Sequence, residues 1–287
     1  MSLPTLHFQR IAFAVNPSKQ GAADLGVELE KIARERGREA LRVDSFPVER
    51  EALEGVDLCV VLGGDGSILG VVDAAAHHAV PVLGFNFGRL GFMANFDARE
   101  AKDVFPAILD GRGCMIDHRS VLEVTDASGL RVLGLNDLVI KTISSHMVHL
   151  QVRSGTNDVN DYYADGLIVA TPTGSTAYNV AAGGPIVHPR APVLILTPVS
   201  PHTLSTRAIV LEESAELEIR LRSEPRQIQI AVDGRSVFET AHAFPLKATV
   251  CRARRFALLQ HPDYSHFHVL RQKLQWSGAV PFRLSPG

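Results

Sequence analysis

Short apolar runs alternate with stretches of helical spacing over the first part of the chain. The runs that predict strands covered on both faces occupy residues 11–15, 40–43, 58–62 and 80–84. Apolar residues three and four apart predict helices over 22–36, which Gly37 ends, and over 97–109. Because strands that alternate with helices form parallel sheets with right-handed crossovers, this pattern predicts an α/β domain.

The pattern changes to a period of two between residues 111 and 119. Alternating segments separated by turn residues occupy 120–126, 133–140, 149–153, 209–211, 216–221, 227–232 and 247–252. Such segments are typical of antiparallel strands with one buried face, and helical spacing returns over 264–274. We therefore expect an α/β domain over 1–115, a β-rich domain over 116–260 and a C-terminal segment over 261–287.

A glycine-rich turn follows the predicted strand Leu58–Leu62. It reads Gly63-Gly64-Asp65-Gly66-Ser67, and Ser67 is predicted to be the N-cap of the next helix. Ligands bind at the carboxyl ends of strands in open α/β sheets, and glycine lets the backbone approach a phosphate closely. A simple turn role for Asp65 stays open on these residues alone. A phosphate-binding loop, however, gains from a carboxylate only if that group binds a metal or accepts a proton.

A second glycine-rich stretch runs from Ala164 to Gly184. An apolar strand over 167–170 leads into a turn with three hydroxyls, those of Thr173, Ser175 and Thr176. Small residues over 181–184 then leave room for a ligand or another backbone. Helix capping accounts for one of the hydroxyls but not for the cluster, so the stretch favours binding of ribose or phosphate.

Composition and charge place the chain among ordinary globular enzymes. It has 46% hydrophobic and 21% charged residues and a net charge of −2, which gives no reason to expect nucleic-acid or membrane binding. The three cysteines are far apart and have no metal-ligand spacing, which suits a reducing compartment. No secretion signal or membrane-spanning run is evident in the sequence, so we expect the protein in the cytoplasm.

Both glycine-rich stretches resemble motifs of known kinases. The segment Gly63–Gly66 is similar to the Gly-Gly-Asp-Gly motif of NAD kinases, diacylglycerol and sphingosine kinases, and phosphofructokinases. The segment Asp165–Tyr178, followed by Ala182-Gly-Gly-Pro-Ile186, resembles the signature of NAD kinases alone. Further stretches that agree with this family occupy 88–92, 135–139, 197–202, 261–265 and 274–276. The resemblance covers nearly the whole chain, from Ile11 to Trp276.

This resemblance implies an NAD kinase-like fold of two domains, with NAD in the cleft and the C-terminal segment returning to the first domain. The implied reaction transfers a phosphoryl group from ATP, or from polyphosphate, to the 2′-hydroxyl of the adenosine ribose of NAD and forms NADP. It implies a homodimer or homotetramer in which residues near Asp165 contribute across a subunit interface. Because the sequence shows no dedicated protein site for Mg²⁺, we expect Mg²⁺ to arrive with ATP.

The same resemblance assigns roles to individual residues. It implies that Asp65 is the proton acceptor and that backbone amides at Gly63, Gly64 and Gly66 contact the ATP phosphates. The implied NAD-binding residues are Asp65, Gly66, Asn136, Asp137, His146, Tyr163, Asp165, Thr176, Ala177, Tyr178, Asn179, Val180, Ala181 and Arg235. Three positions depart from the family pattern: Asp137 replaces Glu, Arg235 replaces an amide side chain, and Arg89 replaces Asn or Ser.

Two other functions are compatible with part of the sequence. A lipid or sugar kinase would share Gly63–Gly66, but the chain has no large basic amphipathic segment for lipid, and the second signature argues against sugar. A non-catalytic NAD(P)-sensing module would keep the hydroxyl cluster, but it would not need a proton acceptor at Asp65.

Overall fold

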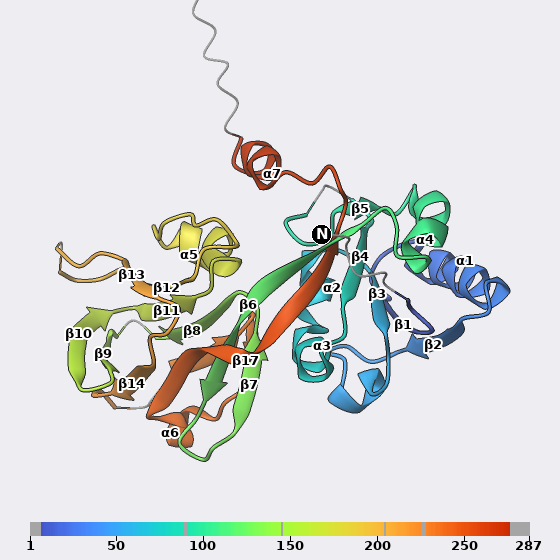
Figure 1. The fold of residues 1–287 in the computed structure, drawn as a ribbon. Helices are drawn as coiled ribbons and strands as arrows, with labels where there is room; N and C mark the ends of the chain where they lie inside the picture. Colours follow the sequence, from blue (N-terminus) through green and yellow to red (C-terminus); the bar gives the residue numbers. More distant parts are fainter. Residues whose placement is uncertain (1–6, 89–90, 145, 204, 225–227, 276–287) are drawn as a thin grey trace, which may run out of the picture.

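The computed structural model describes residues 7–88, 91–144, 146–203, 205–224 and 228–275 (Figure 1). Arg89 and Trp276, two positions that entered the resemblance, lie outside these residues. The strands are β1 (Arg10–Val15), β2 (Glu39–Val43), β3 (Leu58–Leu62), β4 (Val82–Asn86), β5 (Phe96–Asp97), β6 (Met115–Thr125), β7 (Arg131–Gly134), β8 (Asp137–Thr142), β9 (Val148–Ser154), β10 (Asn157–Ala164), β11 (Gly166–Ala170), β12 (Val193–Val199), β13 (Ile209–Glu212), β14 (Leu217–Leu221), β15 (Ile228–Val232), β16 (Arg235–Ser236) and β17 (Leu246–Gln260). The helices are α1 (Ala22–Glu35), α2 (Asp65–Leu69), α3 (Val72–His78), α4 (Ala101–Leu109), α5 (Tyr178–Ala181), α6 (Thr240–Ala243) and α7 (His266–Lys273), with short 3-10 helices η1 (Arg50–Leu53) and η2 (Gly174–Thr176).

The first domain is a parallel sheet with helices on both faces. Strands β4, β3, β1 and β2 lie in that order, and every pair is parallel. One face packs against α1 and α4, and the other packs against η1, α2 and α3. All five residues of β3 are buried, as its continuous apolar sequence predicts for a strand covered on both sides. The predicted α/β domain is confirmed.

The second domain consists of two sheets with a common apolar core. One sheet is antiparallel, in the order β13-β12-β11-β8-β15-β16. It faces β9, β10, β14 and the first part of β17, and the core contains Leu138, Leu150, Leu167 and Ile219. Leu150 and Ile219 come from strands with an alternating pattern and one buried face, whereas Leu138 and Leu167 come from β8 and β11, which contain continuous runs of buried residues. The predicted β-rich domain is also confirmed.

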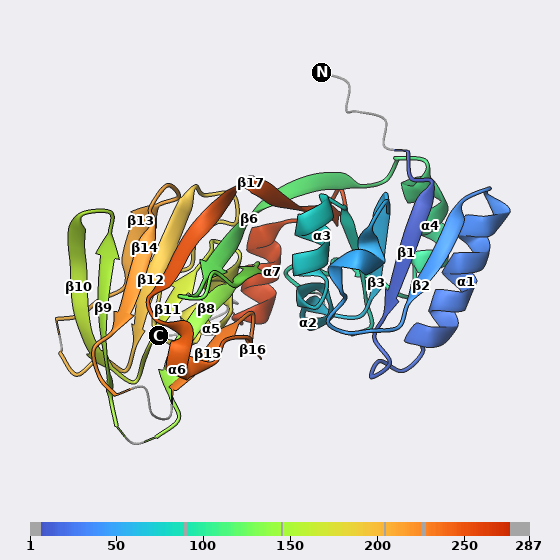
Figure 2. The same cartoon turned by 90° about the horizontal axis from the view of Figure 1, so that it is seen from below.

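Strand β17 joins the two domains. It pairs with β6 along nearly its whole length, with β14 at its beginning, and with β4 in parallel at its end, where Leu258 lies opposite Val82. The ribbon of β6 and β17 therefore crosses from one domain to the other (Figure 2). The sequence pattern predicts only 247–252 as a strand, since the run of Arg252, Arg254 and Arg255 interrupts the alternation. Among the described helices, none is long and apolar enough to cross a membrane.

The structure differs from the sequence pattern in several elements. Ser67 is not an N-cap: α2 already begins at Asp65, and the Ser67 hydroxyl accepts a hydrogen bond from Asn16 Nδ2 at 2.8 Å. Helix α4 begins at Ala101, later than predicted, because Phe96–Asp97 pairs with β4 as β5. The pattern misses β10, a largely exposed edge strand, and β12, which contains Pro198.

Candidate active site

The turn after β3 is closely packed. The Gly63 amide donates to the Phe85 carbonyl at 3.0 Å, and a Cβ at Gly63 would lie 2.1 Å from Ser67 Oγ. Gly63 therefore allows the turn to pack, while its amide is used within the sheet and is not free for a phosphate. Gly66 is exposed, with open space around its Cα, so a ligand can approach the backbone there.

The Asp65 carboxylate is held by the loop between β4 and β5. Its oxygens accept hydrogen bonds from the amides of Phe92 at 2.8 Å, Met93 at 3.0 Å and Ala94 at 2.9 Å. An ionised carboxylate has about four acceptor positions, so one remains for a substrate hydroxyl. Asp65 is half-buried and lies at a pocket, which leaves that position accessible.

Two lysines lie at the pocket that contains Asp65, which we call the β3 pocket. Its lining includes Gly64, Asp65, Gly66, Lys19 and Lys273, and its volume is about 470 Å³. Lys19 follows β1, whose carboxyl end is next to that of β3, whereas Lys273 comes from α7. Ammonium groups beside exposed backbone suit a chain of phosphates. Neither lysine was predicted as a site residue, although the parallel order of β1 and β3 could have indicated Lys19.

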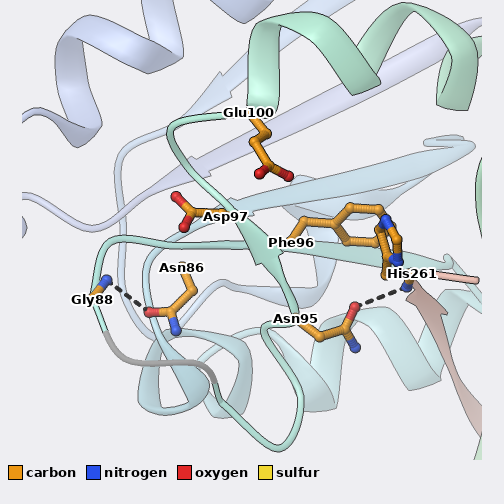
Figure 3. Close-up of a pocket in the computed structure, with 7 residues that line it drawn as sticks. All are labelled: Asn86, Gly88, Asn95, Phe96, Asp97, Glu100 and His261. Carbon is orange, nitrogen blue, oxygen red and sulfur yellow. Dashed lines mark hydrogen bonds between the residues drawn. The ribbon is translucent and has the colours of Figure 1, made fainter. Parts of the chain in front are cut away.

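A neighbouring pocket has an acidic rim (Figure 3). It shares Asn86 and Gly88 with the β3 pocket, and Asp97 and Glu100 also line it. Asn95 Oδ1 accepts a hydrogen bond from the His261 amide at 2.9 Å, which ties the C-terminal segment to the first domain. Asp97 is paired with Arg99, so the charge of Glu100 is what disfavours a polyanion here, and phosphates are better accommodated beside the lysines of the β3 pocket.

A further pocket, which we call the β8 pocket, lies between α2 and the second domain. Four predicted NAD-binding residues line it: Asn136, Asp137, Ala177 and Tyr178. Leu69, Lys141 and Gln229 also line it, and the sequence did not predict them as site residues. Leu69 lies one helical turn after Asp65, so α2 separates the two pockets.

The Asp137 side chain is buried in the wall of the β8 pocket. Burial raises the pKa of its carboxyl to about 7, and the nearby charge of Asp233 adds to this shift. Among the described residues no group donates a hydrogen bond to the Asp137 carboxylate. A substrate hydroxyl in the pocket would supply that missing donor.

Asp233 fixes the turn that carries Asn136 and Asp137. Its buried carboxylate accepts hydrogen bonds from the amides of Leu135 and Asn136, both at 2.7 Å, and of Asp137 at 3.2 Å. From the other side, Gly174 packs so closely that a Cβ would lie 2.0 Å from the Asn136 carbonyl oxygen. The position of the β8 pocket wall therefore depends on residues far apart in the sequence.

The segment from Thr176 to Ala181 lies partly at the β8 pocket and partly in the protein interior. Asn179 is fully buried, and its Nδ2 donates to the carbonyls of Ser175 and Pro185, both at 3.0 Å. Its Oδ1 accepts a hydrogen bond from Thr197 at 2.7 Å, so the side chain holds the turn together. Thr176 donates to the Thr173 carbonyl, and Val180 and Ala181 lie on α5. Of this segment, only Ala177 and Tyr178 line the β8 pocket among the described residues.

Other predicted site residues lie at a distance from Asp137. Asp165 and Asp137 lie at opposite ends of the pairing between β11 and β8. Asp165 directly precedes β11, whereas Asp137 lies opposite Ala170, the last residue of β11. Five residues along a strand span roughly 17 Å. His146 is exposed in the loop after β8, and Tyr163 stacks on His149 with ring centroids 4.1 Å apart. One copy of the chain does not bring these three residues to the β8 pocket.

Arg235 lies on β16, next to the turn that contains Asp233. Burial raises the pKa of the Asp233 carboxyl, and the positive charge of Arg235 opposes this shift. Arg235 is not among the described residues that line the β8 pocket.

A methyl group at Gly91 is expected to disturb the loop around Asp65. A Cβ there would lie 2.2 Å from Asp65 Oδ1, so Gly91→Ala must displace either the carboxylate or the loop. We expect a drop in kcat of about tenfold, since a small misplacement of a reacting group is costly. Steady-state kinetics beside a thermal melt checks this, and Gly88→Ala, where a Cβ meets open space, is the control. Normal turnover in Gly91→Ala would show that the loop adapts freely.

Asp137→Asn is expected to stabilise the protein above neutral pH. Between the ordinary pKa of 3.8 and about 7, the native carboxyl holds a proton that the unfolded chain has lost, so wild-type stability falls as pH rises through this range. Asn carries no charge, so the variant should be more stable by about 2–4 kcal/mol at pH 8. The difference should nearly vanish at pH 4. Urea unfolding at both pH values measures it, and an equal difference at both would contradict the prediction.

Known proteins are similar to this chain over nearly its whole length. The model of the ATP-NAD kinase N-terminal domain matches residues 45–113, and that of the ATP-NAD kinase C-terminal domain matches residues 135–257. The chain is 37% identical to an NAD kinase from Symbiobacterium thermophilum, covering 92% of this chain and 98% of the relative. It is 33% identical to an NAD kinase from Wolinella succinogenes, covering 96% and 98%.

Solved structures share the fold. The yeast NADH kinase complexed with NADH superposes with a TM-score of 0.82 at 22% identity, covering 98% of this chain and 90% of that one. An NAD kinase from Archaeoglobus fulgidus in complex with ATP has a TM-score of 0.74 at 21% identity, covering 92% and 98%. The matched domains, the near full-length relatives and the two-domain architecture together show that this chain belongs to the NAD kinase family.

Proposed function

We propose that this protein transfers the terminal phosphoryl group of ATP to the 2′-hydroxyl of the adenosine ribose of NAD and releases NADP. The observation that carries the proposal is the position of Asp65. It lies at the β3 pocket, which has two lysines, and α2 leads from it to the β8 pocket at Leu69. A carboxylate between a site for phosphates and a site for a sugar is what transfer to a ribose hydroxyl requires.

Asp65 acts in this proposal as the acceptor of the ribose proton. A ribose hydroxyl loses its proton readily only as the phosphoryl group is transferred, so a weak base suffices if it is well placed. The amides of residues 92–94 fix the carboxylate and leave one acceptor position. The fixed position of the carboxylate therefore compensates for its weak basicity.

The phosphates of ATP are assigned to the β3 pocket. Lys19 and Lys273 would balance their charge, and the open backbone at Gly66 would let them approach closely. Because Gly63 uses its amide within the sheet, only Gly64 and Gly66 remain as amide contacts from the predicted set.

A magnesium ion fits this pocket as a partner of the nucleotide. Mg²⁺ usually keeps several waters and binds substrate phosphates, and because the remaining acceptor position of Asp65 is assigned to the ribose hydroxyl, phosphates and waters would supply most of its ligands. The described residues contain no cluster of three or more His, Cys, Asp or Glu that could hold a metal by themselves. When bound, the ion would neutralise charge on the phosphoryl oxygens.

The NAD dinucleotide is assigned to the β8 pocket. Asn136 and Asp137 would bind sugar hydroxyls there, and Tyr178 offers an aromatic face. The buried Asp137 carboxylate supports this assignment, because a hydroxyl donor would offset the cost of its burial.

A homodimer or homotetramer would bring the remaining predicted residues to the site. His146, Tyr163 and Asp165 lie far from the β8 pocket of their own chain, near the exposed apolar side chains of Ile143 and Met147. An exposed apolar patch beside polar residues is typical of an interface. Light scattering of the pure protein measures the oligomeric state, and a monomer at enzyme-assay concentrations would contradict this part of the proposal.

The reaction is tested by incubating the protein with Mg-ATP and NAD and measuring NADP. We expect NADP formation that depends on both substrates. Replacing NAD with diacylglycerol or fructose 6-phosphate tests the other kinase classes, and replacing ATP with polyphosphate tests the donor. Tight NAD binding without turnover would favour the sensing module instead.

A further inference from the structure

A cavity lies where the start of β6, the end of β17, the turn before β12 and the beginning of α7 meet. Its volume is about 240 Å³, and its lining includes Asp117, Arg119, Arg190, Gln260 and His266. Among the described residues it shares no lining residue with the β3 or β8 pocket. We call it the Arg119 cavity. Pockets for drug-sized ligands have about 300–1,000 Å³, so this one suits a smaller ligand.

Three buried side chains at this cavity have donors without a partner. Arg119, Gln260 and His266 are 2%, 1% and 8% exposed. Arg119 Nη2, Gln260 Nε2 and both ring nitrogens of His266 form no hydrogen bond with the described residues. The Arg119 guanidinium also donates through Nη1 to Thr173 Oγ1 at 3.4 Å and interacts with the Tyr264 hydroxyl, which itself donates to the Phe92 carbonyl at 3.2 Å. Buried donors are normally paired, so an acceptor inside the cavity would explain all three.

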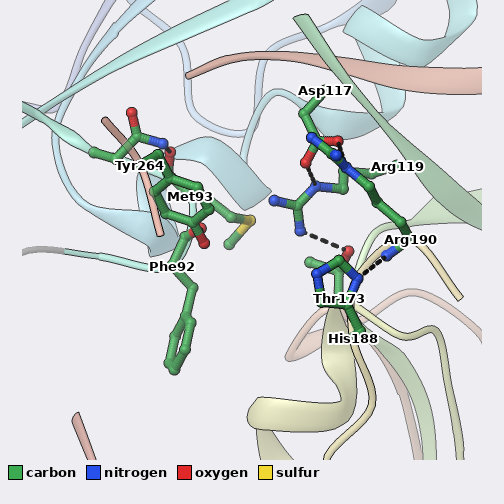
Figure 4. Close-up of polar contacts among 9 residues, drawn as sticks. Phe92, Met93, Asp117, Arg119, Thr173, His188, Arg190 and Tyr264 are labelled. Atoms are coloured by element: carbon green, nitrogen blue, oxygen red, sulfur yellow. Dashed lines mark hydrogen bonds and ion pairs between the residues drawn. The ribbon is translucent and has the colours of Figure 1, made fainter. Parts of the chain in front are cut away.

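The charges around the cavity favour a negatively charged acceptor. Arg119 Nε donates to Asp117 at 2.6 Å and Arg190 Nε donates to the other oxygen at 2.8 Å, as Figure 4 shows. Asp117 is the carboxylate of the described lining, so two guanidiniums leave a net positive charge. Burial, His188 and Arg119 together lower the pKa of His266 to about 4, so its neutral ring still offers one N–H donor at pH 7.

We propose that the Arg119 cavity binds a phosphate-class oxyanion, either free inorganic phosphate or the terminal group of a longer phosphate. Arg119 supplies the charge, because Asp117 already orients its Nε edge and leaves Nη2 for the ligand. Gln260 and His266 supply neutral donors from two other elements. This site is separate from the nucleotide pockets, and it does not depend on the proposed NAD kinase reaction.

The test is binding of inorganic phosphate to the full-length protein by calorimetry, at constant ionic strength and without nucleotide. We expect saturable binding that Gln260→Leu and His266→Phe each weaken about tenfold or more, since each removes a hydrogen bond to a charged ligand. His268→Phe is the matched control, because His268 is an exposed histidine of the same helix. Lys19→Gln removes a charge from the β3 pocket and should leave this binding unchanged. Circular dichroism shows that each variant is folded.

A measurement on the wild-type protein makes the result independent of any variant's stability. With ¹⁵N-labelled histidine, the ring nitrogens of His266 should shift on addition of phosphate, and His266→Phe identifies their signals. Parallel titrations with ATP and tripolyphosphate identify the source of the phosphate group. A shift of the His266 signals with inorganic phosphate, ATP or tripolyphosphate supports the site. No shift with any of the three overturns the proposal.

Three results would overturn the proposal. Absence of saturable binding of inorganic phosphate, together with no shift of the His266 signals with ATP or tripolyphosphate, would mean that water fills the cavity. Equal weakening by His268→Phe would remove the role of His266. Binding lost in Lys19→Gln but kept in Gln260→Leu and His266→Phe would place the phosphate in the β3 pocket.

Discussion

Asp65→Asn is expected to lower kcat by about 10²–10⁴. Asn cannot take the ribose proton. It also disturbs the loop, because its amide group would face the Phe92 amide, which now donates to Asp65 Oδ2 at 2.8 Å. The amides of Met93 and Ala94 keep their acceptor, since both bond to Oδ1. Turnover of NAD beside calorimetric NAD binding measures the effect, and NAD binding should change much less than kcat.

Gly91→Ala separates the chemical role of Asp65 from its role in the loop. That variant keeps the carboxylate but strains the same loop, so its smaller loss of kcat gives the size of the structural effect. If Asp65 only organises the loop, the two variants should lose activity about equally. If Asp65 mainly binds Mg²⁺, raising the metal concentration should partly restore Asp65→Asn. Near wild-type kcat in Asp65→Asn would end the assignment of Asp65 as the base.

Asp233→Ala is expected to lower the free energy of unfolding by about 3–5 kcal/mol. The substitution leaves the amides of Leu135, Asn136 and Asp137 without the acceptor that now binds them at 2.7–3.2 Å. Asp233 is buried, so water cannot easily replace the carboxylate. Urea unfolding measures the loss. The KM for NAD should also rise, because the turn that carries Asn136 and Asp137 loses its support.

Asp126→Ala is a matched control for Asp233→Ala. Asp126 Oδ1 also accepts hydrogen bonds from two backbone amides, those of Ser128 and Leu130, but in a turn that is open to solvent. Its removal should cost about 1 kcal/mol or less, because water can take over these donors. A similar loss in both variants would show that burial of Asp233 is not the source of its effect.

Much of the fold could be predicted from periodicity. Burial of one face of a helix or strand leaves a regular pattern of apolar residues, and local turn residues mark where the element ends. Leu58–Leu62 was predicted with its observed ends, since every residue in it is buried and a glycine turn follows. The helix over Ala22–Glu35 was predicted within one residue because its buried residues recur at helical spacing on one face and Gly37 follows it. Strand β10 was missed because an edge strand has few buried side chains to produce a pattern.

The sequence by itself determined the two domains, the carboxylate at the end of β3 and the kinase family, because these follow from local patterns and motif order. Only the tertiary structure decided what surrounds that carboxylate: the amides of residues 92–94, Lys273 from α7, and the support of Asn136 and Asp137 by Asp233. It also brought Arg119, Gln260 and His266 to one cavity. These contacts join residues far apart in the chain, and strand pairing and domain packing, which no local period records, set their distances.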